Sequence, residues 1–158
     1  MNIVKTNTLS QEDKHAFFHC YCGGSRMVVS SGDYDLNILP GLAAIEGDEI
    51  IGILTFLVFD AHVEIISLHC TEQNKGVGTR LINMMDDVVK QYQKHKLKVI
   101  TTNDNLDALR FYEKRGFRVV NVIPNAVETA RAKKPDIPKL SESGIPIKDE
   151  LVLLKTYV

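Results

Sequence analysis

Two glycines stand where an amphipathic helix is expected to begin, in the run Gln73-Asn74-Lys75-Gly76-Val77-Gly78. The first N–H groups of a helix have no partner inside it, and the helix dipole places positive potential at the same end. Glycine lets the backbone turn sharply and lets a bulky anion approach it closely. The run is therefore a candidate anion-binding turn, although a connection that is merely glycine-rich has the same composition.

The spacing of the glycines limits which anion the turn could hold. A P-loop requires G-x-x-x-x-G-K-[ST], and the chain contains no such run. A dinucleotide fingerprint needs a third glycine at position 81, which is Leu81. The spacing that fits is Gln-x-x-Gly-x-Gly, and it resembles the acyl-CoA signature [QR]-x-x-G-x-[GA] of the GNAT superfamily of N-acyltransferases. In that family the turn and the following helix hold the pyrophosphate of CoA.

A second segment, about thirty residues further on, resembles the same family. It reads Asn105-Leu-Asp-Ala108-Leu-Arg-Phe111-Tyr112-Glu113-Lys114-Arg115-Gly116-Phe117 and matches the family pattern N-x-x-A-x-x-F-Y-E-K-x-G-F throughout. The resemblance covers residues 42–123, and residues 127–150 look like an uncharacterised bacterial subgroup of the superfamily. Two independent motifs in the family's order make this resemblance the main basis for a functional hypothesis.

The resemblance implies that acetyl-CoA is the cosubstrate and assigns residues to it. The backbone of Leu68 and Cys70 would hold the pantetheine arm, with Leu68 positioned for the thioester carbonyl. Asn105 would bond the CoA arm, although Asn is also a preferred helix N-cap. The residues expected around the pyrophosphate are Gln73, Asn74, Lys75, Gly76, Val77, Gly78 and Thr79.

Acetyl transfer to an amine also needs a base for the amine and a proton for the leaving thiolate. Tyr112 matches the family tyrosine that protonates the departing sulfur, and aromatic packing is the alternative role. Glu64 lies on the strand before the turn and is the candidate base. Strand alternation predicts that Glu64 shares a face with Ile66 and Leu68, and a solvated edge position is the alternative.

Other groups near the turn are weaker candidates for catalysis. His62, His69 and Glu72 could serve as the base, and imidazole titrates in the useful pH range. Alternation, however, directs His69 to the face opposite Glu64. Cys70 could carry an acyl group, but direct attack is the family's usual route and no basic partner is placed beside the thiol.

Alternating strands and helices must position these residues. Strands at 42–46, 50–59 and 62–70, joined by short turns, predict an antiparallel meander. A helix capped by Ser10 precedes them and ends at Gly23-Gly24, before a polar stretch. The helix after the turn should bury one face, made of Val77, Leu81, Met84, Met85, Val88 and Tyr92.

The second half of the chain continues this alternation. A strand at 97–102 implies a right-handed crossover with a parallel neighbour, and a helix at 105–115 ends at Gly116. Strands at 117–123 and 151–157 form a final pair, separated by a proline-rich excursion with a possible short helix at 128–133. The predicted fold is α/β (α+β): one GNAT domain, residues 1–158, with a mixed antiparallel/parallel sheet of about six to seven strands flanked by helices.

Composition excludes several classes of protein. The chain of 158 residues has a net charge of −1, which disfavours nucleic acid or an anionic membrane as partner. It lacks an apolar run of the ~18–20 residues that span a bilayer, and its N-terminus does not read as a signal peptide, so a cytoplasmic location is expected. Three cysteines argue against a disulfide framework, and His15 with His19 lacks a third ligand, so no metal is expected.

The sequence therefore predicts an N-acetyltransferase in which a primary amine attacks acetyl-CoA directly. The acceptor would be a small molecule or a peptide, bound by residues 20–37 and 125–150, and the protein would be a monomer or homodimer. An alternative is a CoA-binding sensor or interaction module without turnover. A nucleotide-binding protein using the same turn is a third possibility, disfavoured by the missing P-loop lysine.

Overall fold

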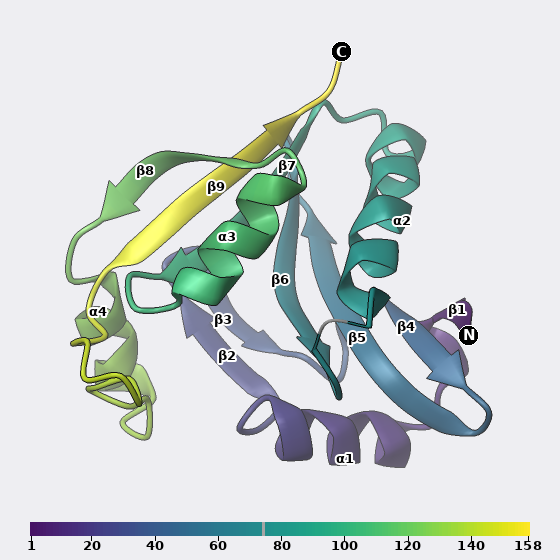
Figure 1. Cartoon of the computed structure of the whole chain (residues 1–158), viewed down its shortest axis with the longest axis horizontal. Helices are drawn as coiled ribbons and strands as arrows, with labels where there is room; N and C mark the ends of the chain where they lie inside the picture. The colour runs from purple at the N-terminus through teal and green to yellow at the C-terminus, as the bar shows by residue number, and fades with distance from the viewer. Residues whose placement is uncertain (74) are drawn as a thin grey trace. The chain divides into compact units, whose positions relative to one another are not determined.

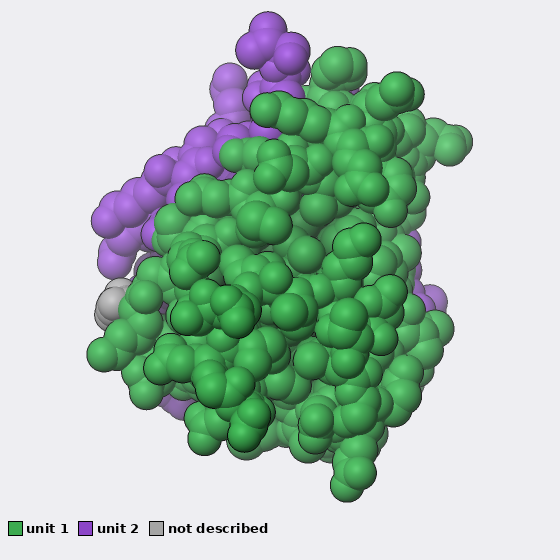
Figure 2. Space-filling model, turned by 90° about the vertical axis from the view of Figure 1, so that its right-hand side faces the viewer, with its two compact units in different colours: residues 1–27, 34–95 green, residues 28–33, 96–158 purple. Residues whose placement is uncertain are grey.

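The protein has a mixed α/β fold, with a seven-stranded mixed sheet flanked by four α-helices (Figure 1). The computed structural model describes residues 1–73 and 75–158. The predicted fold class is thus confirmed. Contacts divide the chain into two units, residues 1–27 with 34–95 and residues 28–33 with 96–158, coloured separately in Figure 2. Each unit is described by itself, and the prediction of a single domain stays a prediction.

The first unit contains four strands of the sheet in the order β1-β4-β5-β6, and every neighbouring pair is antiparallel. Its elements are β1 (Asn2–Lys5), η1 (Thr6–Thr8), α1 (Gln11–Tyr21), β4 (Gly41–Glu46), β5 (Glu49–Val58), β6 (Val63–Cys70) and α2 (Val77–Gln91). The predicted meander is confirmed. Gly47, with φ of 61°, makes the β4–β5 turn, as expected of glycine between two strands.

Three short strands were not expected from the sequence. β1 pairs with β4, and β2 (Arg26–Val29) forms a two-stranded sheet with β3 (Gly32–Asp35). The last two flank the polar stretch that follows Gly23-Gly24, for which no strand was predicted. Strands of four residues are too short for an alternating pattern to stand out from a loop.

Helix α1 begins and packs as its sequence indicates. The Ser10 hydroxyl accepts the N–H of Asp13 at 3.1 Å, which confirms the predicted cap. Phe17 and Phe18 are buried in a cluster that also contains Ala43 of β4 and Ile53 of β5. Burial of these apolar side chains fixes α1 on the meander.

Helix α2 packs against β4, β5 and β6 (Figure 1), through a face that contains Val77, Leu81 and Met85 of the predicted one and differs from it elsewhere. Met84 and Tyr92 are 38% and 45% exposed, while Ile82 and Val89 are fully buried. The prediction for Met84 and Tyr92 was wrong, because apolar spacing defines more than one stripe on this helix. The stripe that faces the sheet consists of Val77, Leu81, Ile82, Met85 and Val89.

The second unit contains the last three strands of the sheet. Its elements are β7 (Lys96–Thr102), α3 (Leu106–Lys114), β8 (Arg118–Ile123), α4 (Ala126–Lys133) and β9 (Glu150–Thr156). The predicted antiparallel pair of β8 and β9 is confirmed, but β9 also pairs with β7 and so lies between them. The parallel crossover predicted between residues 62–70 and 97–102 would link the two units, and it stays a prediction.

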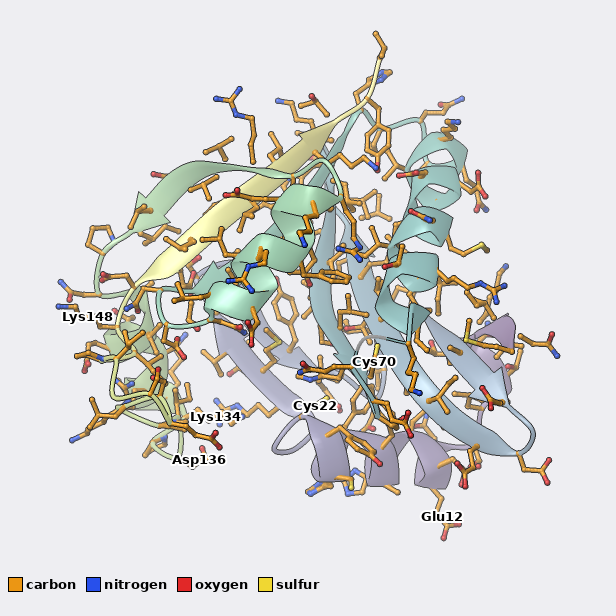
Figure 3. The ribbon with its side chains drawn as sticks, viewed as in Figure 1. Glu12, Cys22, Cys70, Lys134, Asp136 and Lys148 are labelled. Carbon is orange, nitrogen blue, oxygen red and sulfur yellow. The ribbon has the colours of Figure 1, made fainter. Side chains whose placement is uncertain are left out.

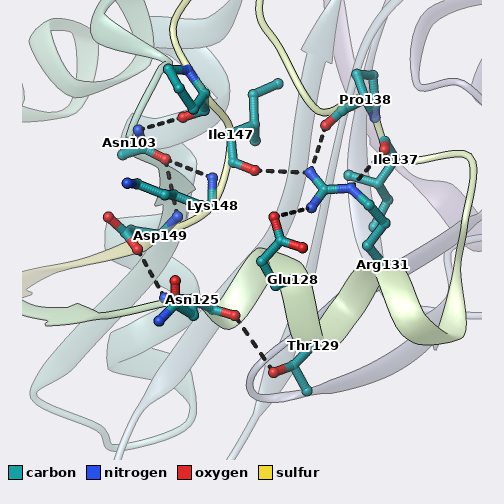
Figure 4. A network of polar contacts seen from close by, with 11 residues as sticks. Asn103, Asn125, Glu128, Thr129, Arg131, Ile137, Pro138, Ile147, Lys148 and Asp149 are labelled. Carbon is teal, nitrogen blue, oxygen red and sulfur yellow. Dashed lines mark hydrogen bonds and ion pairs between the residues drawn. The ribbon is translucent and has the colours of Figure 1, made fainter.

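The proline-rich segment after α4 is ordered by one buried arginine (Figure 4). Arg131 is 8% exposed. Its guanidinium donates to the carbonyl oxygens of Ile137 at 3.0 Å, Pro138 at 2.7 Å and Ile147 at 2.8 Å, and pairs with Glu128 at 2.7 Å. The short helix expected at 128–133 is confirmed as α4, and the donors of the planar guanidinium hold the segment that follows it against this helix.

A second polar centre holds the end of the same segment (Figure 4). The Asn103 side chain donates to the carbonyl oxygen of Pro146 at 2.8 Å and accepts the N–H groups of Lys148 and Asp149, both at 3.0 Å. The Asp149 carboxylate accepts the N–H of Asn125 at 2.8 Å. These bonds connect the start of α4 and the end of β7 to the residues directly before β9.

Candidate active site

The N-terminus of α2 is a candidate anion-binding site. Gly76 is the N-cap residue, with φ of 78° in the left-handed region, and a Cβ built there would meet nothing within 4 Å. The cap has no side-chain hydrogen bond and the first turn has no acidic residue. In α1, by contrast, Ser10 caps the helix, and Glu12 and Asp13 lie in the first turn. Within the described residues, the first turn of α2 therefore carries no acidic side chain to offset the helix dipole, which favours a negative ligand.

Gly52 on β5 allows this helix end to approach the sheet. A Cβ on Gly52 would lie 2.9 Å from Cγ1 of Val77, 3.2 Å from Cδ1 of Leu81 and 3.3 Å from Sγ of Cys70. The first two turns of α2 therefore pack directly on the backbone of β5. Sequence reasoning missed Gly52, although a glycine inside an apolar strand is a signal of close approach.

The residues that lead into α2 are partly anchored and partly exposed. The N–H of Thr71 donates to the carbonyl oxygen of Ile51 at 3.0 Å. The side chains of Glu72 and Lys75 lie 3.9 Å apart and are 69% and 66% exposed, so this ion pair contributes little. Gln73 is exposed as well, and Asn74 lies outside the described residues.

Strand β6 carries a bulge just before the predicted pantetheine-binding residues. Thr55 pairs with Ser67 and Phe56 pairs with Ile65, so Ile66 has no partner on β5. The hydroxyls of Thr55 and Ser67 are buried and 2.6 Å apart. A bulge interrupts the alternation of side chains, so the alternation expected along this strand does not hold across Ile66.

Glu64 is buried on β6, opposite Leu57. It is 1% exposed, so the alternative of a solvated edge position is wrong. Its Oε1 atom lies 3.6 Å from Nε2 of His62, whose side chain is 23% exposed and stacks on Phe59 with ring centroids 5.0 Å apart. A carboxylate buried this deeply is costly to the fold and is a candidate functional group.

The end of β6 carries two titratable groups that burial affects in opposite ways. Burial lowers the pKa of His69 below its ordinary value of 6.5, which favours the neutral imidazole. Burial raises the pKa of the Cys70 thiol, and Cys70 lies at the carboxyl end of β6 (Figure 3). A raised thiol pKa disfavours the thiolate, which argues against an acyl-cysteine route.

In the second unit, the two residues of the second motif have clear structural roles. The Asn105 side chain accepts the N–H of Ala108 at 3.1 Å and caps α3. Tyr112 is 7% exposed and packs edge-on against Phe111 and Phe117, with centroids 5.2 and 5.3 Å apart. Capping and packing are thus observed, and the roles in CoA binding and sulfur protonation stay predictions.

The site residues divide between the units. Glu64, Leu68, Cys70 and the turn belong to the first, whereas Asn105 and Tyr112 belong to the second. Among residues 1–73 and 75–158, no group of three His, Cys, Asp or Glu side chains could hold a metal ion. Over the same residues, each helix is too short or too polar to cross a membrane.

Comparisons with known proteins identify the family. The model of the Acetyltransferase (GNAT) family matches residues 9–117. The uncharacterized protein YxbD of Bacillus subtilis (strain 168) is 42% identical over 156 residues, which are 98% of each chain. The chain therefore belongs to the GNAT acetyltransferase family, as its two motifs predicted.

Solved structures agree with this assignment. A GNAT family acetyltransferase from Elizabethkingia anophelis with acetyl-CoA bound is 27% identical, with a TM-score of 0.67 over 77% of this chain and 78% of that one. The IAA acetyltransferase from Bacillus cereus ATCC 14579 has a TM-score of 0.70 at 20% identity, over 98% of this chain and 99% of that one. The second likeness concerns the fold alone.

Proposed function

We propose that this protein transfers the acetyl group of acetyl-CoA to a primary amine by direct attack. The observation that carries the proposal is the open N-terminus of α2, where Gly76 leaves room for a ligand and no acidic side chain occupies the first turn. The bound acetyl-CoA in the Elizabethkingia relative supports acetyl-CoA as the cosubstrate.

The cofactor would be held at two places by the first unit. The turn from Gln73 to Gly78 and the N–H groups of the first turn of α2, including that of Thr79, would bind the pyrophosphate. The backbone of Leu68 and Cys70 would bond the pantetheine arm and direct the thioester carbonyl. In the second unit, Asn105 would add a bond to the arm besides capping α3.

The chemistry requires one bond formed, one broken and two protons moved. The neutral amine attacks the thioester carbon, which forms the C–N bond, and collapse of the intermediate breaks the C–S bond. Glu64 would take the proton that the nitrogen loses, either directly or through water. The Tyr112 phenol would give its proton to the CoA thiolate. The products are the amide and free CoA.

The acceptor would be a small molecule or a peptide amine, selected by residues 20–37 and 125–150. Arg131 is an unsuitable contact for it, because its guanidinium is buried and bonded to three carbonyl oxygens and Glu128. We further propose that the segment from 134 to 148 shapes the acceptor cleft. Cytoplasmic location and a monomeric or homodimeric state remain part of the proposal.

Thiol release tests the proposal. Purified protein is mixed with acetyl-CoA and, in turn, with polyamines, amino acids, aminoglycosides and peptides with free N-termini, and free CoA is measured with a thiol reagent. We expect release that depends on one class of amine, and loss of that release in Glu64→Gln. CoA binding without release for any amine would favour a non-catalytic CoA-binding sensor, and absence of CoA binding would refute both functions.

A further inference from the structure

A cavity of about 580 Å³ lies in the first unit, away from the turn. It is lined by the end of β1, η1, the start of α1, the segment from 37 to 42 and the last turn of α2. Helix α2 has fifteen residues, so the cavity and the proposed pyrophosphate seat are separated by about 20 Å along the helix. A volume of this size suits a small organic ligand.

The cavity combines an apolar wall with uncompensated positive charge. Leu9, Leu39, Phe56 and Val88 contribute apolar side chains, and the lining contains Lys5 and Lys14. Among the lining residues that the structure describes, none is Asp or Glu. The charge of the lining therefore favours an anion with an apolar body.

Lys14 is the buried polar group of this cavity. It is only 5% exposed, and its Nζ atom donates to the carbonyl oxygen of Asn37 at 2.9 Å. An ammonium has three protons to donate, and within the described part of the chain Lys14 makes no ion pair. A charge buried in this way is expected to have an anionic partner.

Asn37, which also lines the cavity, is incompletely bonded too. Its amide nitrogen lies 3.3 Å from Nδ1 of His15, while its Oδ1 atom is buried without a hydrogen-bond partner among the described residues. Exchanging the amide oxygen and nitrogen would leave the nitrogen in that buried position instead. The exchanged assignment places a hydrogen-bond donor in that buried position, and a donor is the group that an anion could use.

We propose that this cavity is a second small-molecule site, which binds a monocarboxylate with a ring-sized apolar body. The carboxylate would accept hydrogen bonds from the Lys14 ammonium and from the Asn37 amide nitrogen in the exchanged orientation, and the body would lie against the apolar wall. A single buried ammonium suits one negative charge, whereas a phosphate dianion would require more donors. The rim is formed by Ile38 and Tyr92, which are 74% and 45% exposed.

Calorimetry with phenylacetate tests this site, with phenylacetamide and inorganic phosphate as the comparison ligands. All titrations contain saturating CoA, so that a ligand of the CoA seat is kept out, and no turnover is required. We expect phenylacetate to bind and both comparison ligands to bind about tenfold more weakly. The amide lacks the charge-assisted hydrogen bond to Lys14, and phosphate lacks an apolar body and needs more donors. Equal affinity for acid and amide, stronger binding of phosphate, or absence of phenylacetate binding would each overturn the proposal.

Two variants place the ligand in the cavity. Lys14→Met keeps the apolar stem and removes the charge, and should weaken phenylacetate binding about tenfold. Ile38→Glu changes an exposed residue, so it leaves the fold intact while it repels an anion at the rim, and Ile38→Lys is its matched control. Phenylacetate affinity that is the same in Ile38→Glu and Ile38→Lys would contradict the assignment, even if Lys14→Met failed to fold.

Discussion

Replacing Thr79 by Glu should make α2 more stable and CoA binding weaker, two effects of opposite sign. Thr79 is the third residue of α2, and the first turn has no acidic side chain. A carboxylate at this position can accept an orphan N–H group of the first turn and complement the helix dipole. It would therefore occupy the seat proposed for the pyrophosphate and repel that ligand.

Both effects have a size that can be measured. An acidic side chain in the first turn contributes about 0.3–1 kcal/mol, which raises the Tm of a chain of this length by roughly 1–4 °C. A carboxylate about 6 Å from a phosphate charge, at an effective dielectric constant of about 40, repels it by about 1.4 kcal/mol. Two such charges, reduced by salt screening, correspond to about a tenfold to hundredfold loss of affinity.

Thr79→Gln is the matched control, because it has the same reach without the charge and loses the same hydroxyl. Scanning fluorimetry without ligand gives the Tm, and calorimetry at low ionic strength gives the Kd for CoA. We expect Thr79→Glu to have the higher Tm and the weaker CoA binding of the two. Equal affinity in both variants would refute the seat at the N-terminus of α2.

Three further predictions concern the contact between α2 and β5, the proposed acid Tyr112 and the half-buried His69. Gly52→Ala should lower the free energy of unfolding, measured with urea, by about 1–3 kcal/mol and weaken CoA binding, because its Cβ would lie 2.9 Å from Cγ1 of Val77. Gly47→Asn is the control, since nothing lies within 4 Å of a Cβ there. The same loss in both variants would contradict the steric explanation. Tyr112→Phe should slow thiol release about tenfold without changing CoA affinity, and equal rates would remove Tyr112 from the mechanism. His69 has a lowered pKa in the folded state, so the unfolded state binds more protons. The free energy of unfolding should therefore fall as the pH drops below about 6.5. His69→Gln should flatten that decline, and an unchanged pH slope would exclude His69 as its source.

Features that depend on neighbouring residues were predictable from the sequence. Ser10 and Asn105 both accept a backbone N–H three residues further along, so their side-chain chemistry and position sufficed to predict a cap. Gly76 and Gly116 have φ values of 78° and 95°, a region that glycine enters at little cost. The two family motifs contain three of these four residues, which explains why they identify the fold.

Features that depend on distant segments could not be predicted. The position of β9 between β7 and β8 is set by pairing between strands far apart in the chain. The bulge at Ile66 lies in the short β5–β6 hairpin, but it depends on the register of the two strands, which the alternation of residues does not reveal. Arg131 bonds to backbone carbonyl oxygens. Every residue has such an oxygen, so the sequence does not indicate which ones Arg131 contacts. Likewise, the sequence identified Glu64 as a candidate base but left open whether it was buried.

The most direct test of the central claim is the NMR response of backbone amides to CoA. In ¹⁵N-labelled protein, the N–H groups of Val77, Gly78 and Thr79 should shift strongly downfield as CoA is added, because they would donate to its pyrophosphate. The amides of the first turn of α1, which Ser10 already caps, serve as the internal control and should stay in place. Saturable CoA binding that leaves the amides at 77–79 unshifted would contradict the account.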